Sequence, residues 1–226
     1  MKVAVVGKDV DGLEKTLKSY GLEIGNESPD FVFSYGGDGA ILFSERLYSG
    51  VSKVTVRCSS KCNRCEFDSD DIEQIVDKLK SGRYEMKEYM KIEADFSGKT
   101  LVALNEIQVR NKLFTKAVRF NVYLDDELLY ENVIGDGIVI STPFGSTAYY
   151  TSVGGKRFDS GIGIALNNPH ERAKSVVAGE SSVVEIEILR EDAYLVYDND
   201  EEGKVLLKKG DKIAVRKHNG AARFVI

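Results

Sequence analysis

The stretch Phe31-Val32-Phe33-Ser34-Tyr35-Gly36-Gly37-Asp38-Gly39-Ala40-Ile41-Leu42 decides how the first part of the chain folds. A short apolar run rich in β-forming residues stops at three glycines that surround one aspartate, and an amphipathic stretch from Ala40 to Tyr48 follows at once. This order predicts a buried strand, a tight turn and the start of a helix.

The turn Gly36-Gly37-Asp38-Gly39 has a composition suited to binding phosphate. Glycine adopts positive φ and lets backbone N–H groups approach a ligand closely, and the N-terminus of a helix adds positive potential. Asp38 then places a carboxylate where it can bind a divalent cation or take a proton. An ordinary glycine turn with an N-capping aspartate is an equally good interpretation of this stretch alone.

Composition and charge narrow the class of protein. The chain has 226 residues, of which 42% are hydrophobic and 30% charged, as is usual for a globular protein with a substantial core. Its net charge of −5 gives no support for a nucleic-acid or anionic-membrane partner. It contains no apolar run of bilayer length, and Met1-Lys2 leads directly into the apolar run at positions 3–6 rather than into a leader. We therefore expect a cytoplasmic protein that binds neither nucleic acid nor membranes.

All three cysteines, Cys58, Cys62 and Cys65, lie in one short segment. An odd number in one patch does not form a disulfide framework. The spacing allows an iron–sulfur cluster or, with a fourth ligand, zinc, and it also allows a redox-sensitive loop. Free cysteines in a reduced cytoplasm are the favoured interpretation.

The pattern of apolar and polar residues changes near residues 82–92. Before this point, apolar strands at 2–7, 31–34 and 53–57 alternate with helical patterns at 10–20, 40–48 and 70–81, which predicts a small parallel α/β unit, Rossmann-like, over residues 1–88. After it, short alternating runs such as 118–124 and 184–188, separated by turn residues, predict a β-rich, sandwich-like domain over residues 89–226. The last strand residues are expected to return to the first domain.

Two further features of the β-rich half carry chemistry. Residues 135–155 combine glycine, serine, threonine and tyrosine at high density, a composition that allows close backbone approach, hydroxyl hydrogen bonds and ring stacking. A Ser/Thr-rich loop is the plainer alternative. Upstream, Asn105-Glu106 interrupts an otherwise apolar strand expected over Leu101–Val109, so both side chains must find partners or lie in a pocket.

The order of these motifs resembles that of the NAD kinase family. The resemblance rests on Gly36-Gly37-Asp38-Gly39, then Asn105-Glu106, then Asp136-Gly137 with the block from Ser141-Thr142-Pro143 to Tyr149, and it covers nearly the whole chain. The glycine turn alone is shared with diacylglycerol-type lipid kinases and phosphofructokinases, whereas the long block is specific. The resemblance implies transfer of a phosphate from ATP or polyphosphate to the 2′-hydroxyl of the adenosine ribose of NAD, giving NADP.

The resemblance also implies roles for individual residues. Asp38 would take the 2′-hydroxyl proton, and Gly36, Gly37 and Gly39 would shape the phosphate-facing turn. The dinucleotide would be held by Asn105, Glu106, Asp136, Thr147, Ala148, Tyr149 and Ser152. A divalent cation such as Mg²⁺ would neutralise the phosphates, and the chain would form a homodimer or homotetramer, with part of the pocket supplied across the subunit interface. The acceptor sugar would lie between the glycine turn and the 136–152 block.

Three departures from the family pattern leave alternatives open. Ala40 stands where the family usually has Thr, Phe144 replaces a common Thr or Ser, and the segment Arg57–Phe67 replaces a glycine-rich Asn-x-Gly-x-Leu-Gly-Phe-Leu segment. A non-catalytic dinucleotide-binding sensor on the same fold, with the cysteine patch as its redox input, is one alternative. A related lipid or sugar kinase is another, because the glycine turn is shared with such enzymes. The sequence does not decide the phosphoryl donor, the preference for NAD over NADH, or the number of subunits.

Overall fold

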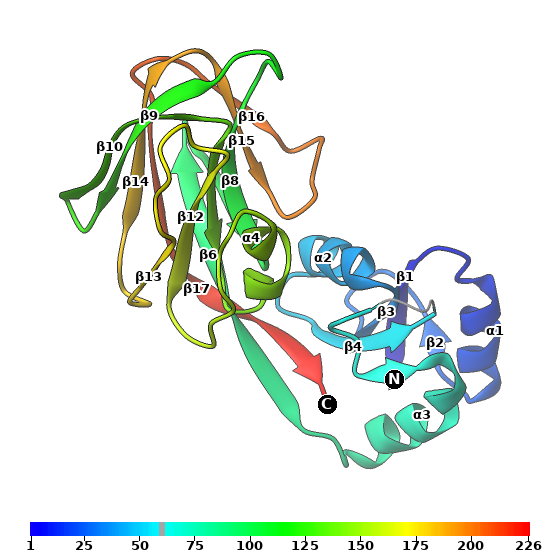
Figure 1. Cartoon of the computed structure of the whole chain (residues 1–226). Helices are drawn as coiled ribbons and strands as arrows, with labels where there is room; N and C mark the ends of the chain where they lie inside the picture. The colour runs from blue at the N-terminus through cyan, green and yellow to red at the C-terminus, as the bar shows by residue number, and fades with distance from the viewer. Residues whose placement is uncertain (59–61) are drawn as a thin grey trace. The chain divides into compact units, whose positions relative to one another are not determined.

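The computed structural model describes residues 1–58 and 62–226. It divides into two compact units, of which one comprises Met1–Tyr89 with Ala221–Ile226 and the other Met90–Gly220 (Figure 1). The strands β6 and β17 each run from one unit into the other, because their residues 86–96 and 212–225 cross the division.

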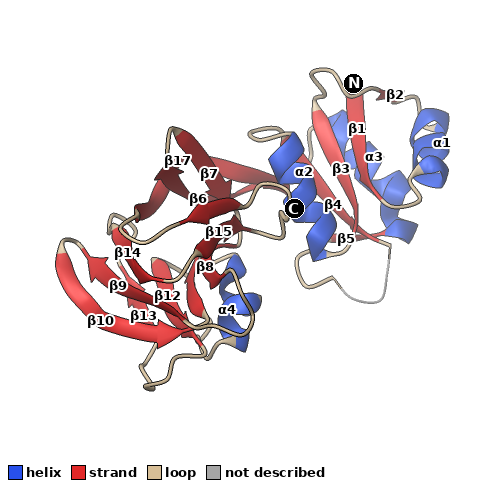
Figure 2. Cartoon of the chain, turned by 90° about the horizontal axis from the view of Figure 1, so that it is seen from above, coloured by secondary structure: helices blue, strands red, loops and turns tan. Residues whose placement is uncertain are grey.

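The first unit is a parallel sheet with helices on both faces (Figure 2). Its strands pair in the order β2-β1-β3-β4, with β5 beside the end of β4 and Phe224 of β17 paired to Lys53. Their bounds are β1 Lys2–Gly7, β2 Glu23–Ile24, β3 Phe31–Gly36, β4 Ser52–Arg57 and β5 Phe67–Asp68. The helices are α1 Asp11–Ser19, α2 Asp38–Leu47 and α3 Ile72–Ser81, the last preceded by the 3-10 turn η1 Ser69–Asp71.

Alternation along the strands explains how the helices are placed. In β1, Val3 joins a cluster with the apolar faces of α1 and α3, whereas Ala4 and Val6 lie in a cluster on the opposite side. Successive side chains of a strand point to opposite faces, so a strand with apolar residues at every position must be covered on both. The helix α2 contacts β1, β3 and β4 and covers the face opposite α1 and α3.

A buried ion pair fixes α2 against the sheet. Lys53 on β4 is fully buried, and its ammonium group bonds to the Glu45 carboxylate on α2 and donates to the Tyr48 carbonyl at 2.6 Å. Both charges are out of water, so each depends on the other for its stability. The glycine turn lies at the opposite end of the same helix.

The second unit is an antiparallel β-sandwich. One sheet contains β9 Val118–Leu124, β10 Glu127–Gly135, β14 Val184–Arg190 and β17 Lys212–Val225, with β6 Met86–Phe96 and β7 Lys99–Ala103 joined to it through β17. The other pairs in the order β13-β12-β11-β8-β15-β16, with bounds Val176–Ala178, Ile162–Asn167, Gly137–Ser141, Glu106–Asn111, Ala193–Tyr197 and Val205–Leu207. Apolar side chains from both sheets, Phe120 and Ile186 from one and Ile107 and Ile138 from the other, share one buried core.

The expected fold class, a small Rossmann-like α/β part followed by a β-rich sandwich, is therefore confirmed. The expected single strand over Leu101–Val109 is wrong, because β7 ends at Ala103 and β8 begins at Glu106. Within residues 1–58 and 62–226, no helix has the length and apolar character needed to span a membrane.

Candidate functional site

The glycine turn joins β3 directly to α2. Gly36 ends the strand with φ of +155°, a conformation that side chains disfavour, and a Cβ built on it would lie 3.0 Å from the Ala40 Cβ. The helix begins at Asp38, two residues earlier than the amphipathic pattern predicts, because Gly37 is extended and serves as its N-cap. No side chain caps this terminus. The Ala40 N–H donates to the Gly37 carbonyl at 2.9 Å, and the N–H groups of Asp38 and Gly39 are suited to an anionic ligand.

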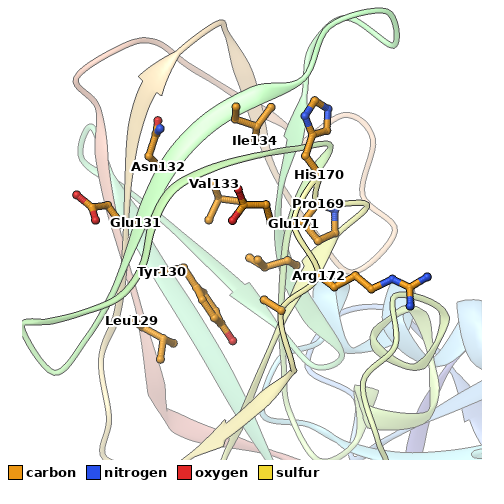
Figure 3. A pocket seen from close by; sticks show the side chains of 12 residues that line it. Leu129, Tyr130, Glu131, Asn132, Val133, Ile134, Pro169, His170, Glu171 and Arg172 are labelled. Carbon is orange, nitrogen blue, oxygen red and sulfur yellow. The ribbon is translucent and has the colours of Figure 1, made fainter.

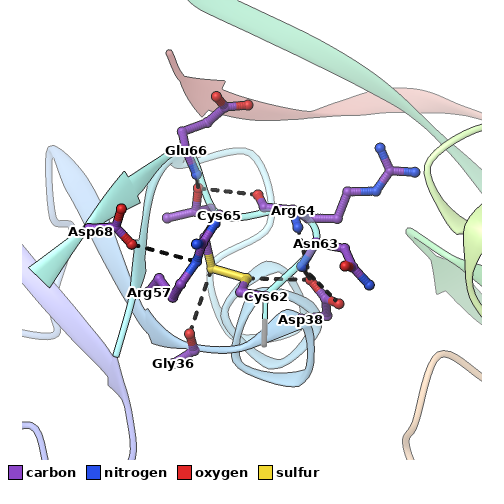
Figure 4. Close-up of a disulfide and its surroundings, with 10 residues drawn as sticks. Gly36, Asp38, Arg57, Cys62, Asn63, Arg64, Cys65, Glu66 and Asp68 are labelled. Carbon is purple, nitrogen blue, oxygen red and sulfur yellow. Dashed lines mark hydrogen bonds and ion pairs between the residues drawn. A yellow bond between two sulfur atoms is a disulfide. The ribbon is translucent and has the colours of Figure 1, made fainter. Parts of the chain in front are cut away.

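Asp38 is half-buried and is held by the segment that contains the cysteines (Figure 4). Its Oδ1 accepts the backbone N–H groups of Asn63 and Arg64, both at 3.0 Å, while Oδ2 has a longer contact of 3.4 Å with the Asn63 N–H. These two amides orient the carboxylate through one oxygen and leave lone pairs on the other.

The expectation that the cysteines are free is wrong for two of them. Cys62 and Cys65 form a disulfide with Cα atoms 5.6 Å apart, and Cys58 is the exposed free thiol. In the described part of the chain, no group of three or more His, Cys, Asp or Glu side chains is placed to hold a metal ion. The sequence argument failed because it counted three cysteines as a set, whereas a loop of two intervening residues brings just two of them within bonding distance.

In the second unit, the break between β7 and β8 is held by a carboxylate distant in sequence. Asp198 Oδ1 accepts the N–H groups of Asn105 at 2.7 Å and Glu106 at 3.3 Å, and its Oδ2 accepts that of Leu104 at 3.0 Å. The Asp198 N–H in turn donates to the Glu106 carbonyl at 2.9 Å. Three successive amides are thus satisfied by one side chain, which fixes the conformation of the Asn105-Glu106 peptide.

The Ser-Thr-Pro block binds the same peptide from the carbonyl side. Thr142 donates its hydroxyl to the Leu104 carbonyl at 2.6 Å and its N–H to the Asn105 carbonyl at 2.9 Å. A Cβ on Gly145 would lie 2.3 Å from the Asn105 carbonyl oxygen, so this position requires glycine. Among the described residues, none hydrogen-bonds to the Asn105 side-chain amide, which is therefore available to a ligand.

Glu106 lies in an unusual electrostatic environment. It is 4% exposed, and its Oε2 has no hydrogen-bond partner among the described residues. Burial, and then repulsion from the Asp198 carboxylate, raise the pKa of Glu106 from its ordinary value of 4.5 to about 8, against a smaller opposing effect of the Gln108 side chain, whose Nε2 donates to Oε1 at 3.3 Å. The carboxyl group is mostly protonated at neutral pH and can act as a hydrogen-bond donor.

Residues 145–152 form two short helical turns, η2 Gly145–Thr147 and α4 Tyr149–Ser152. Tyr150 is fully buried against β11 and β12 and anchors this segment. Thr147 and Ser152 are exposed and Ala148 and Tyr149 are half-buried, so these predicted binding residues present an accessible surface.

Asp136 lies at the other end of the strands that carry Asn105-Glu106. Its carboxylate accepts the side-chain N–H groups of Asn111 at 3.4 Å and Asn168 at 3.0 Å. Because β8 and β11 are antiparallel, with Glu106 opposite Ser141 and Arg110 opposite Gly137, the two ends are four residues apart along β8. At about 3.3 Å per residue this is about 13 Å.

Tyr149 connects the helical segment to the Asp136 end of the sheet. Its hydroxyl accepts the Asn167 side-chain N–H at 3.4 Å, and the Arg110 guanidinium lies 5.3 Å from its ring centroid. Residues 145–152 therefore contact Asn105 through Gly145. Through Tyr149 they also contact Asn167 and Arg110, at the end of β8, β11 and β12 where Asp136 lies. The second unit thus brings its predicted site residues into two groups, while Asp38 and the glycines belong to the first unit.

A pocket of about 720 Å³ lies beside β10 (Figure 3). It is lined by residues 129–134 of β10, by Leu166 and by the loop 169–173. None of the predicted binding residues lines it.

Sequence reasoning missed Asp198 and the Cys62–Cys65 pair. Asp198 is 92 residues from Glu106 and stands in a turn-like Asp-Asn-Asp run, so its sequence context indicated a surface turn. Asp198 has a φ of +47°, which Asp adopts more readily than most residues. The sequence does not reveal this backbone conformation. For the Cys62–Cys65 disulfide, the Cys-x-x-Cys spacing was a signal in the sequence that the two cysteines could pair.

The two units thus carry the three motifs on which the family resemblance rests. The first unit holds the glycine-aspartate turn at the end of a parallel strand, and the second holds the ordered Asn105-Glu106 peptide and the Ser-Thr-Pro segment bound to it. Residues 104–226 match the family model of the ATP-NAD kinase C-terminal domain. This match covers more than half of the chain, and the chain belongs to the NAD kinase family.

Individual relatives agree with this assignment. The chain is 32% identical over 211 residues to a bifunctional NADP phosphatase/NAD kinase of Methanococcus maripaludis, matching 88% of this chain and 37% of the relative. It is 28% identical over 216 residues to an NAD kinase of Thermoplasma acidophilum, matching 93% of this chain and 79% of that one. It therefore spans little more than a third of the bifunctional relative.

The fold agrees with a solved structure, that of an NAD kinase from Archaeoglobus fulgidus in complex with ATP. The TM-score is 0.84 with 22% sequence identity, covering 99% of this chain and 93% of that one.

Proposed function

We propose that this chain is an NAD kinase that transfers the terminal phosphate of ATP or polyphosphate to the 2′-hydroxyl of the adenosine ribose of NAD, giving NADP. The main support for the proposal is that the backbone around Asn105-Glu106 is hydrogen-bonded from two sides. Thr142 donates to its carbonyl groups, and the Asp198 carboxylate accepts its N–H groups. The two motifs that resemble the NAD kinase family are thereby one hydrogen-bonded structure. Membership of the family supports the same conclusion.

Asp38 acts as the general base in this proposal. The 2′-hydroxyl oxygen forms a bond to the terminal phosphorus, the bond from phosphorus to the leaving phosphate oxygen breaks, and the hydroxyl proton passes to Asp38. A carboxylate oriented through Oδ1 by two amides retains Oδ2 lone pairs for this proton. Phosphoryl transfer depends mainly on positioning and charge stabilisation, so an oriented base is what the reaction requires.

The uncapped N-terminus of α2 and the turn at Gly36, Gly37 and Gly39 are suited to phosphate oxygens. Mg²⁺ or another divalent cation would neutralise charge on the phosphates. Magnesium in such sites is held by one or two carboxylates together with substrate phosphates and water, so the absence of a three-ligand cluster among the described residues is compatible with it. Asp38 is the carboxylate that could contribute.

NAD binds to the second unit in this proposal. Asn105 and Glu106 offer a buried amide and a protonated carboxyl group, while Thr147, Ala148, Tyr149 and Ser152 provide the accessible surface of the block. Asp136, with a carboxylate that already accepts two asparagine amides, is an acceptor for a ribose or nicotinamide donor.

We place the enzyme in the cytoplasm as a homodimer or homotetramer, with Asp136 supplied to each pocket by a neighbouring copy. Within one chain, the Asn105-Glu106 end and the Asp136 end of β8 are about 13 Å apart, and this separation supports two separate points of contact with NAD. Closed symmetric assemblies are the common form of such oligomers.

The direct test is NADP formation from NAD with Mg²⁺ and, in parallel, ATP, other nucleoside triphosphates or polyphosphate. Asp38→Asn should lower kcat by about 10²- to 10⁴-fold, with NAD affinity measured by calorimetry unchanged, because the general base contributes to the chemical step. Asp77→Asn, on the exposed side of α3, is the matched control and should retain full activity. Failure to form NADP with every donor, while NAD still binds, would identify a dinucleotide-binding sensor instead.

A further inference from the structure

The disulfide Cys62–Cys65 encloses the two residues whose amides bind Asp38. Asn63 and Arg64 both donate to Oδ1 at 3.0 Å, and the Cys62 Sγ lies 3.4 Å from the same oxygen. Because this sulfur is in a disulfide, it has no proton, and its approach to Oδ1 is a contact rather than a donated hydrogen bond. The bridge therefore constrains the backbone atoms that orient the carboxylate.

The same bridge contacts the glycine turn and is fixed on its far side. The Cys65 Sγ lies 3.6 Å from the Gly36 carbonyl oxygen. The next residue, Glu66, donates its N–H to the Thr55 hydroxyl on β4 at 3.0 Å. The disulfide therefore lies in a segment that is hydrogen-bonded to β4, and its two sulfurs contact the Gly36 carbonyl and the Asp38 carboxylate (Figure 4).

The two cysteines differ in exposure. Cys62 is 7% exposed, whereas Cys65 is half-buried, so Cys65 is the more exposed residue of the pair. Disulfides in reducing compartments are chiefly transient or redox-sensing rather than structural. A partly accessible bridge against a carboxylate fits that class.

We propose that Cys62–Cys65 is a site of thiol–disulfide exchange with a dithiol reductant, and that its reduction lowers turnover by releasing the Asn63 and Arg64 amides from the Asp38 carboxylate. This inference rests on the proposed function of Asp38. Asn63 and Arg64 are positioning residues, because they act on the reaction through Asp38.

The exchange balances without any further reactant. A thiolate of the dithiol attacks the Cys65 sulfur and the Cys62 sulfur leaves, and the second thiol of the reductant then displaces Cys65 and forms the disulfide of the reductant. Two electrons and two protons pass to the protein, giving two thiols. Cys62 then carries a proton beside Oδ1 and competes for it with the two amides, while the loop has lost its covalent constraint.

The experiment compares the full chain in two redox states in a Cys58→Ser background, which removes the one free thiol. Protein is oxidised with glutathione disulfide or reduced with dithiothreitol and desalted, and thiols are counted by alkylation and mass spectrometry after denaturation. We expect no thiols in the oxidised protein and two in the reduced one. Reduction should lower kcat for NADP formation about ten-fold, which corresponds to about 1.4 kcal/mol, with KM for NAD unchanged. Cys62→Ser/Cys65→Ser should have the lower kcat in both treatments.

Hydrogen exchange gives a readout that does not depend on activity. The amides of residues 62–66 should exchange faster after reduction, whereas those of α3 should not change. Equal kcat in the two verified redox states, equal exchange, or two thiols remaining after oxidation would each overturn the inference, and so would loss of NAD binding on reduction, which would show a general structural role. If neither state makes NADP, the proposed function fails, and the exchange data still decide whether the disulfide controls the contact with Asp38.

Discussion

Replacement of Glu106 by glutamine tests the electrostatics of the proposed NAD pocket. In the folded chain, burial and then the Asp198 carboxylate raise the pKa of Glu106 to about 8, whereas in the unfolded chain it returns to about 4.5. Between these values the folded state binds a proton that the unfolded state does not, so stability falls as pH rises. The contribution of the Glu106 proton to the free energy of unfolding is present in full below pH 4.5 and is lost as the pH rises through about 8.

The size of the effect follows from the two pKa values. A difference from 4.5 to about 8 corresponds to a ceiling of about 5 kcal/mol, at about 1.4 kcal/mol for each pH unit. Glu106→Gln preserves the shape of the side chain and cannot ionise. The wild type should therefore lose stability relative to this variant as the pH rises from 5 to 8, reaching several kcal/mol at pH 8.

The assay is urea unfolding, followed by circular dichroism, of both proteins at pH 5, 6, 7 and 8. Glu127→Gln on the exposed side of β10 is the matched control and should run parallel to the wild type. A difference between wild type and Glu106→Gln that stays constant within about 1 kcal/mol from pH 5 to 8 would refute the reasoning, because about 4 kcal/mol is expected across those three pH units.

Three other predictions follow from the packing and from the proposed assembly. Lys53→Met should lower the free energy of urea unfolding by about 3–5 kcal/mol because it removes the ammonium group that neutralises the buried Glu45 carboxylate, and adding Glu45→Leu should restore most of the loss. Gly137→Ala should destabilise the protein by at least about 2 kcal/mol, measured as a lower melting temperature, because φ is +142° and the added Cβ would lie 1.8 Å from a carbonyl oxygen of β8. Asn105→Ala and Asp136→Asn should each be inactive, but refolding them together should recover about a quarter of wild-type activity if Asp136 comes from a neighbouring copy in a dimer; no recovery would argue against shared pockets.

The architecture was predictable because it depends on periodicities within short segments. Apolar strands punctuated by Gly36–Gly39 gave the parallel α/β part, and the alternation at 118–124 and 184–188 gave the sandwich. The start of α2 was placed too late because amphipathic periodicity begins at Ala40, whereas the helical backbone begins at Asp38 after an extended Gly37. Boundaries depend on the dihedral angles of single residues, which the apolar pattern does not record.

The arrangement of the site was less predictable because it depends on contacts between distant segments. The Asn105-Glu106 break could be recognised as polar within an apolar run, but the residue that satisfies its amides, Asp198, comes from a turn 92 positions away from Glu106. Which end of the sandwich each motif occupies also follows from the pairing of β8 with β11 and not from the spacing of the motifs.

Residues 57–67, where the family resemblance leads us to expect a glycine-rich segment, include the two residues whose amides bind Asp38. A glycine-rich chain can approach a carboxylate closely because it lacks side chains. Here the approach is made by the amides of Asn63 and Arg64, with the Cys62–Cys65 bridge limiting the conformations of the two residues between the sulfurs. A covalent constraint can be removed by reduction, whereas a glycine-rich backbone has no such chemistry. The substitution therefore gives the site a dependence on thiol redox state that a glycine-rich segment would not provide.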